Sequence, residues 1–209
     1  MKKFIILGVL FILPIVAYLF FASGIHNFAK LPVLTEHVEE LDFNEDIKLE
    51  GKITVLGFLG DELVADGGTL FNLNQKIYKY FGKFQDFQFV FLVSKDFDKE
   101  ALQKVEDELS VISDLDHWHF VFAERQEIES VFNSLETNFT LTDGYSPYVF
   151  LIDKKASLRG RDDDEDVEIL YGYNAEDAAE MSNKMKDDVK ILLAEYRLAL
   201  KKNNADRKI

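Results

Sequence analysis

The sequence Gly51-Lys52-Ile53-Thr54-Val55-Leu56-Gly57-Phe58-Leu59-Gly60-Asp61-Glu62 opens the stretch that decides the fold, and residues 63–81 complete it. Residues 53–59 form an apolar run bounded by glycines, which predicts a buried β-strand. Residues 69–81 carry apolar side chains at spacings of three and four, which predicts an amphipathic helix that ends at Gly82. The loop between strand and helix lies where α/β domains usually present their functional groups.

This loop, residues 61–68, contains no Cys, His, Ser or Lys. Asp61 and Glu62 could form an acid–base pair, although adjacent carboxylates in an open loop are far more often surface groups. Gly67 and Gly68 are explained by a helix entry that needs permissive backbone angles. The loop therefore predicts a binding surface without nucleophilic, redox or thiol chemistry.

The same alternation of strands and helices continues along the chain. Further strands are predicted at residues 87–93, 118–122 and 148–152, with a hairpin or an interrupted edge strand at 157–161 and 167–173. Helices are predicted at residues 97–113 and 127–135, and a last helix is predicted to begin at an Asn174 cap. This order predicts an α/β fold whose largely parallel sheet is covered on both faces.

Composition narrows the possible functions. The 209 residues include 38 acidic and 24 basic ones, a formal net charge of −14, which repels phosphate backbones and argues against nucleic-acid binding. There is no cysteine, which removes disulfides, thiol redox chemistry and cysteine-ligated metals. The length suits one domain with a sizeable core.

The N-terminus predicts a membrane anchor. Residues 4–22 carry no charge, and as a helix they would be about 28 Å long, which is close to the thickness of the hydrocarbon core of a bilayer. Pro14 lies within this segment, and a transmembrane helix tolerates one proline with a kink. A cleaved signal peptide with Ala22-Ser23-Gly24 as its site is the alternative. Lys2 and Lys3 favour a cytoplasmic N-terminus, which puts the remainder outside the cytoplasmic membrane, in the periplasm of a Gram-negative cell.

The predicted organisation is therefore an anchor over residues 1–24, a membrane-proximal spacer and edge strand over 25–50, a domain over 51–202 and a polar tail over 203–209. The spacer carries His26 and His37, for which a solvated surface role is favoured over metal binding.

Several local sequences, taken in order, resemble the SCO/SenC family. They are Gly51-Lys52-Ile53-Thr54-Val55, the strand 89–94 with Asp96 and Asp98, Trp118-His119-Phe120, and the strand 148–153 with Leu158-Arg159-Gly160. That family consists of membrane-anchored copper chaperones of cytochrome oxidase assembly. The resemblance implies a thioredoxin-like fold, a three-layer α/β/α domain with a central mixed sheet.

The chain departs from the family at the copper site. The resemblance places Leu63 and Gly67 at the two cysteine positions of the family loop and Tyr145 at the histidine position. None of these can replace a thiolate or imidazole ligand for copper, so no cofactor is expected. The thioredoxin-like fold also implies a cis peptide bond before Pro147, beside the loop.

Two other places carry candidate ligands. His117 and His119 lie two residues apart on a predicted strand and could share a metal ion, with Trp118 facing the other side; two half-exposed histidines are the plainer interpretation. The run Asp162-Asp163-Asp164-Glu165-Asp166 could hold calcium or a cationic protein, but it lacks the alternating ligands of a calcium loop. Arg159 and Arg161 are expected to pair with that run.

The sequence thus favours a non-enzymatic, membrane-anchored binding or assembly protein for a membrane (respiratory) complex. The predicted partners are the membrane, through the N-terminal helix, and another protein at the membrane. The alternative is a metallochaperone that binds metal through His117 and His119 or through the acidic loop. An enzyme that uses carboxylates has no supporting constellation of residues.

Overall fold

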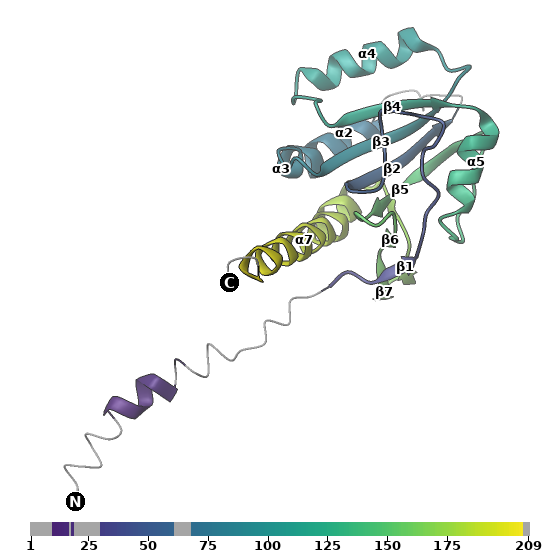
Figure 1. Ribbon diagram of the computed structural model, residues 1–209. Coiled ribbons are helices and arrows are strands. Elements are labelled where there is room, and N and C mark those ends of the chain that lie inside the picture. The colour runs from purple at the N-terminus through teal and green to yellow at the C-terminus, as the bar shows by residue number, and fades with distance from the viewer. Residues whose placement is uncertain (1–9, 17, 19–29, 61–67, 207–209) are drawn as a thin grey trace, which may run out of the picture.

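The computed structural model describes residues 10–16, 18, 30–60 and 68–206 (Figure 1). Its main sheet has seven strands in the order β1-β6-β5-β2-β3-β4, with β9 paired to β5, and β7 and β8 form a separate hairpin. The strands are β1 (Val33–Thr35), β2 (Ile53–Gly60), β3 (Phe87–Ser94), β4 (Trp118–Ala123), β5 (Tyr145–Ile152), β6 (Leu158–Arg159), β7 (Arg161–Asp164), β8 (Glu168–Leu170) and β9 (Tyr173–Asn174).

The sheet is mixed. Strands β2, β3 and β4 are parallel, whereas β5 runs antiparallel to β2 and β6 runs antiparallel to β5. Every residue of β2 and β3 is buried, because helices or loops cover both faces of the sheet. This is why both strands appear in the sequence as continuous apolar runs instead of alternating ones.

The helices lie in two layers around the sheet. They are α2 (Gly68–Leu73), η1 (Asn74–Tyr78), α3 (Lys79–Phe81), α4 (Lys99–Ser110), α5 (Arg125–Asn133), α6 (Ala178–Glu180), η2 (Met181–Met185) and α7 (Lys186–Asp206). One core cluster joins the sheet to the segments α2–α3, α4 and η2–α7. The second core cluster lies on the other face and joins the sheet to α5 and to residues 38–49. The domain therefore has three layers, with η1 and η2 as single π-helical turns inside longer helices.

The segment before β2 belongs to the folded domain. Val33–Thr35 forms an edge strand against β6, as the sequence predicted. The segment also contributes apolar side chains to the two core clusters, namely Leu31, Val38, Leu41 and Leu49. Residues 31–50 are therefore more than a spacer, because their apolar side chains complete the core.

The predicted anchor lies mostly outside the described residues, and only 10–16 and 18 within it are described, as helix. Among the helices in the part of the chain that the structure describes, none combines the length and apolar character needed to cross a membrane.

The prediction of a cis peptide bond before Pro147 is wrong, because the described residues contain no cis peptide bond. Strand β5 begins at Tyr145, so the chain passes through Pro147 in an extended conformation. The register between β2 and β5 shifts between Leu56 and Phe58, which pair with Phe150 and Ser146. Such a bulge accommodates a proline, since proline has no N–H to donate to the neighbouring strand.

The last helix begins later than predicted. Asp177 is the N-cap, and its side chain accepts hydrogen bonds from the backbone N–H groups of Ala179 and Glu180. Asn174, the predicted cap, lies in β9 and accepts a hydrogen bond from Glu176 N–H. Both residue types suit a cap, and the pairing of β9 with β5 decides between them.

Candidate functional site

The candidate site lies at the carboxyl end of β2. The strand ends at Gly60, and the next described residues are Gly68 and Thr69 at the start of α2. The positions Leu63 and Gly67, together with Asp61 and Glu62, lie outside the described residues. Tyr145, which the resemblance places at the histidine position of the family's copper site, pairs with Leu59 at this end of β2. The structure thus brings Tyr145 to the edge of the predicted loop.

Two glycines allow the backbones to approach closely here. Gly60 has φ of +62° and Gly144 has φ of +78°, a region of backbone angles that favours glycine. A Cβ atom on Gly60 would lie 2.5 Å from the carbonyl oxygen of Asp143 and 2.7 Å from the backbone nitrogen of Tyr145. The end of β2 is therefore in direct contact with the turn that leads into β5, and this contact positions Tyr145.

The Tyr145 hydroxyl links three segments of the site. It donates a hydrogen bond of 2.9 Å to Oε1 of Glu176, in the connection between β9 and α6, and it also forms a hydrogen bond with the Thr69 side chain at the start of α2. Asn72 of α2 donates to the carbonyl oxygen of Ala175 at 3.3 Å, which holds the same two segments together. These contacts fix the beginning of α2 against the beginning of the last helix.

Electrostatics keep the Tyr145 phenol neutral. Burial, followed by the hydrogen bond and charge of the Glu176 carboxylate, raises the pKa of Tyr145 to about 12. At neutral pH the side chain is therefore a hydrogen-bond donor and not a phenolate. A neutral phenol is a poor ligand for a soft metal ion such as Cu(I). The sequence analysis singled out Tyr145 but did not predict its hydrogen-bond partners Glu176 and Thr69.

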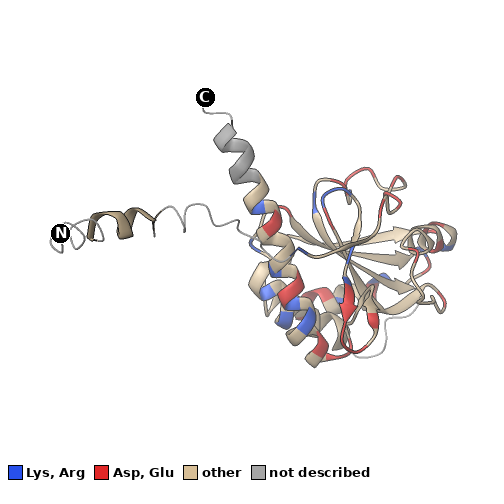
Figure 2. Cartoon of the chain, turned by 90° about the horizontal axis from the view of Figure 1, so that it is seen from below, with Lys and Arg blue, Asp and Glu red and all other residues tan. Residues whose placement is uncertain are grey.

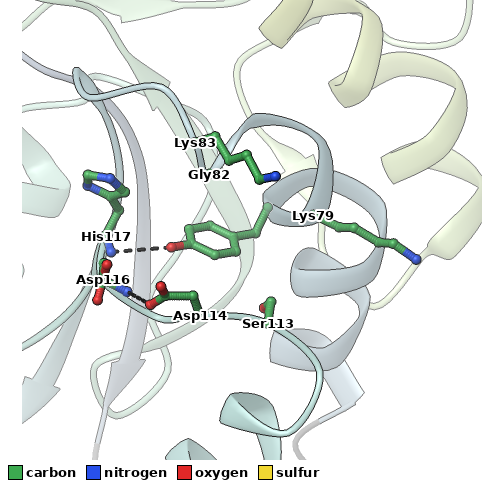
Figure 3. Close-up of a pocket in the computed structure, with 8 residues that line it drawn as sticks. Lys79, Gly82, Lys83, Ser113, Asp114, Asp116 and His117 are labelled. Carbon is green, nitrogen blue, oxygen red and sulfur yellow. Dashed lines mark hydrogen bonds between the residues drawn. The ribbon is translucent and has the colours of Figure 1, made fainter.

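A separate cleft of about 580 Å³ lies at the opposite, amino-terminal ends of β3 and β4 (Figure 3). Its walls are the end of α3, with Lys79, Gly82 and Lys83, and the turn from Ser113 to His117. The Tyr78 hydroxyl accepts a hydrogen bond of 3.3 Å from His117 N–H, and this bond ties the two walls together. Ligands of open α/β sheets usually bind at the carboxyl ends of the strands, so the end of β2 is the favoured site.

The two histidines predicted as a metal pair have different surroundings. His117 precedes β4 and lines the cleft, whereas His119 lies within β4 and pairs with Val90 of the second core cluster. Trp118 points to the other face and stacks on Phe89 with ring centroids 4.8 Å apart, as predicted for alternating strand residues.

Burial, with smaller contributions from the charges of His117 and Lys52, lowers the pKa of His119. Within the described residues, no group of three or more His, Cys, Asp or Glu side chains is arranged to hold a metal ion. The pair His117 and His119 therefore has no third ligand among these residues.

Within the acidic run Asp162–Asp166, Asp164 forms ion pairs inside the folded domain. Asp164 is buried, and its carboxylate lies 2.6 Å from Lys184 Nζ and 3.5 Å from Arg161 Nη1. These interactions outweigh burial and lower the pKa of Asp164. Arg161 thus pairs with the run as expected, and it also contacts Asp188 at 2.8 Å.

The expectation for Arg159 is wrong. This buried guanidinium contacts Asp153 at 2.8 Å and Glu195 at 2.6 Å, and it donates hydrogen bonds to the carbonyl oxygen of Leu31. Its partners come from the N-terminal segment and from α7, so it joins these elements to β6 instead of neutralising the acidic run.

Comparisons with known proteins support the fold. Neither protein-family models nor curated proteins give a match. BsSco, a member of the Sco family of cytochrome c oxidase assembly proteins, matches with a TM-score of 0.50 and 13% identity, over 77% of this chain and 92% of that one. A SCO1/SenC family lipoprotein from Bacillus anthracis matches with a TM-score of 0.48 and 19% identity, over 82% and 99% of the two chains.

The thioredoxin domain of a thiol-disulfide oxidoreductase from Bacteroides vulgatus matches with a TM-score of 0.40 and 15% identity, over 78% of this chain and 98% of that one. At such low identity the likeness shows the fold alone. The likeness to BsSco, together with the strand order, shows that this chain has a thioredoxin-like α/β fold with a central mixed sheet.

Proposed function

We propose that this chain is a membrane-anchored, extracytoplasmic member of the Sco type that works as a binding or assembly factor, without redox or copper chemistry of its own. The anchor is the uncharged segment 4–22, and the thioredoxin-like domain lies outside the cytoplasmic membrane. The partner is another protein at the membrane, such as a component of a respiratory complex. The sequence motifs and the likeness of fold to BsSco support this proposal.

The state of Tyr145 is the observation that carries the proposal. The residue stands where the resemblance places the family's histidine ligand, and its phenol stays protonated and hydrogen-bonded to Glu176. The sequence has no cysteine that could supply a thiolate. The donor set of the family site is therefore missing, and Gly60 and Gly144 bring the end of β2 into close contact with the turn before β5.

A copper titration tests this proposal. The full chain, purified in detergent, is titrated with Cu(I) against a competing chelator, and its ability to reduce insulin disulfides is measured in parallel. We expect no stoichiometric copper and no disulfide reduction. The variant Leu63→Cys/Gly67→Cys/Tyr145→His is the positive control, since it restores the donor types of the family. One copper ion per unmodified chain would refute the proposal.

The same titration also distinguishes the proposed assembly factor from the alternative function, a metallochaperone. If metal binds and the variant His117→Gln/His119→Gln loses it, the alternative is correct and the proposal is wrong. Crosslinking in the native membrane tests the partner, and recovery of the chain alone would contradict an assembly role.

A further inference from the structure

Two aromatic side chains are exposed at the end of α3. Tyr80, within α3, is 54% exposed and Phe84, three residues after its end, is 44% exposed, whereas the neighbouring Tyr78 and Phe81 are buried. Lys79 and Lys83 lie beside them and are exposed as well. Aromatic rings next to lysines are typical of surfaces that meet the headgroup region of a bilayer, where one end of the ring is apolar and the other is wet.

Helix α7 adds further positive charge to this surface. Lys186 Nζ lies 3.4 Å from the centre of the Tyr80 ring, and Arg197 lines the same shallow cavity of about 160 Å³ as Phe84. Lys186 and Arg197 are eleven residues apart, a spacing that returns to the same face of an α-helix. We call the surface formed by Lys79, Tyr80, Lys83, Phe84, Lys186 and Arg197 the basic-aromatic face.

The charges of this face are available for a partner. Among the ion pairs of the described residues, none involves Lys79, Lys83 or Arg197. The neighbouring carboxylates of Asp86 and Asp187 are already paired, with Lys154 and Lys190. Asp114 and Asp116 lie across the cleft from Lys79 and Lys83. A cluster of unpaired cations is unusual in a chain whose net charge is −14.

The face is close to the point where the N-terminal segment enters the domain. Arg159 binds both the Leu31 carbonyl oxygen and the Glu195 carboxylate, which ties the N-terminal segment to α7. Arg197 lies about 3 Å further along the helix axis, on another side of the helix from Glu195. Figure 2 shows Lys and Arg, in blue, along the described part of α7 and the helices beside it. Residues 22 and 31 can be separated by at most about 32 Å of extended chain, so an anchor over 4–22 keeps the face near the bilayer.

We infer that the basic-aromatic face docks on the surface of a bilayer that contains anionic phospholipid. This inference rests on the proposed anchoring of the chain. The lysines and Arg197 meet the anionic headgroups, and Tyr80 and Phe84 enter the interface. Docking holds the acidic remainder of the domain away from the membrane and gives it one orientation towards a membrane-bound partner.

The experiment uses the full chain reconstituted in bilayer nanodiscs of phosphatidylcholine, with or without phosphatidylglycerol. Because the chain has no cysteine, the variant Gln85→Cys accepts one fluorophore beside the face, and Gln126→Cys on α5 is the matched label on the other side of the sheet. A spin label on the lipid headgroups quenches a fluorophore that lies at the bilayer surface. We expect quenching of the Gln85→Cys label in the anionic nanodiscs, weaker quenching in the neutral ones, and loss of the difference in high salt.

The variant Lys79→Gln/Lys83→Gln/Arg197→Gln is expected to lower the ratio of docked to undocked domains on the order of 100-fold, since each cation contributes about five-fold. The control Lys48→Gln/Lys99→Gln/Lys104→Gln removes the same charge from exposed lysines elsewhere and should leave docking unchanged. Equal quenching in both lipids, or equal effects of the two triple variants, would overturn the inference. Anchoring is tested separately, because an anchored chain co-elutes with neutral nanodiscs whether or not its domain docks.

Discussion

The substitution Arg159→Met tests the buried contact that fastens the N-terminal segment and α7 to the sheet. The Arg159 side chain is 5% exposed and the Asp153 side chain is 2% exposed, with 2.8 Å between Nη1 and Oδ2. Met has a similar length and keeps most of the apolar packing, so the variant removes mainly the charge and its hydrogen bonds. It leaves Asp153 as a buried carboxylate without its cation and the Leu31 carbonyl oxygen without its donor.

The magnitude follows from the burial of this pair. Removing one partner of a buried ion pair costs about 3–5 kcal/mol, because the remaining charge is left uncompensated. Asp153 keeps hydrogen bonds from the backbone N–H groups of Lys155 at 2.8 Å and Ser157 at 3.1 Å, which favours the lower half of that range. In a chain of this size each kcal/mol corresponds to about 2–4 °C, so Tm should fall by about 6–16 °C.

The assay is urea unfolding followed by the fluorescence of Trp118, the single tryptophan, which is buried and stacked on Phe89. Lys155→Met is the matched control, because Lys155 is exposed, and it should change the free energy of unfolding by less than about 0.5 kcal/mol. The double variant Arg159→Met/Asp153→Asn should recover about 1–2 kcal/mol, since it removes the uncompensated charge.

Two results would refute this reasoning. One is a loss below about 1 kcal/mol for Arg159→Met, which is the size of an exposed ion pair. The other is a double variant that is less stable than Arg159→Met alone, since that would show that Asp153 is not left as an unfavourable buried charge.

Three further predictions concern the site and the strand beside the cleft. Gly60→Ala should destabilise the domain more than Gly51→Ala in urea unfolding: both positions have positive φ, at a cost of about 1–2 kcal/mol, but a Cβ on Gly51 meets no atom within 4 Å. Tyr145 should form phenolate near pH 12 in an absorbance titration, and Tyr145→Phe should lower the amplitude of the step near pH 12 by one tyrosine, with Tyr196 still titrating there; because the folded pKa of Tyr145 is raised, its stabilising contribution is complete below about pH 10 and is lost as the pH rises through about 12. His119 should titrate below its ordinary pKa in an NMR titration, and because its folded pKa is lowered, folding should weaken as the pH falls below about 6.5; a normal midpoint would contradict its burial.

Much of the fold could be predicted from apolar patterning. The continuous runs of β2 and β3 and the spacing of Leu70, Leu73 and Ile77 identified the central strands and the first long helix. The hairpin β7–β8 could be predicted only in part: the second predicted arm, residues 167–173, contains β8, but the first, residues 157–161, ends where β7 begins, because the β7 sequence Arg-Asp-Asp-Asp has no apolar pattern. Its conformation depends on ion pairs with Lys184, about 20 residues along the chain, and such tertiary contacts have no local signature.

The candidate site, too, could be predicted from the sequence only in part. The resemblance predicted Tyr145 at the histidine position of the family site, and in the structure Tyr145 pairs with Leu59 near the end of β2. Its partner Glu176 lies 31 residues further on, after β9, and no periodic pattern connects the two. The expectation for Arg159 failed for a similar reason, since its partner Leu31 is 128 residues away and is reached only when β1 pairs with β6.

The hydrogen bonds of Tyr145 have a consequence for what this site can do. A side chain must be deprotonated before it can ligate a metal ion, so metal binding releases protons. Tyr145 keeps its proton and donates a hydrogen bond to Glu176, and its hydroxyl also forms a hydrogen bond with Thr69, so that its polar atom is already engaged within the chain. The same contacts hold the start of α2 to the segment that precedes α6. The Tyr145 hydroxyl therefore serves as a structural link between α2, β5 and the segment before α6.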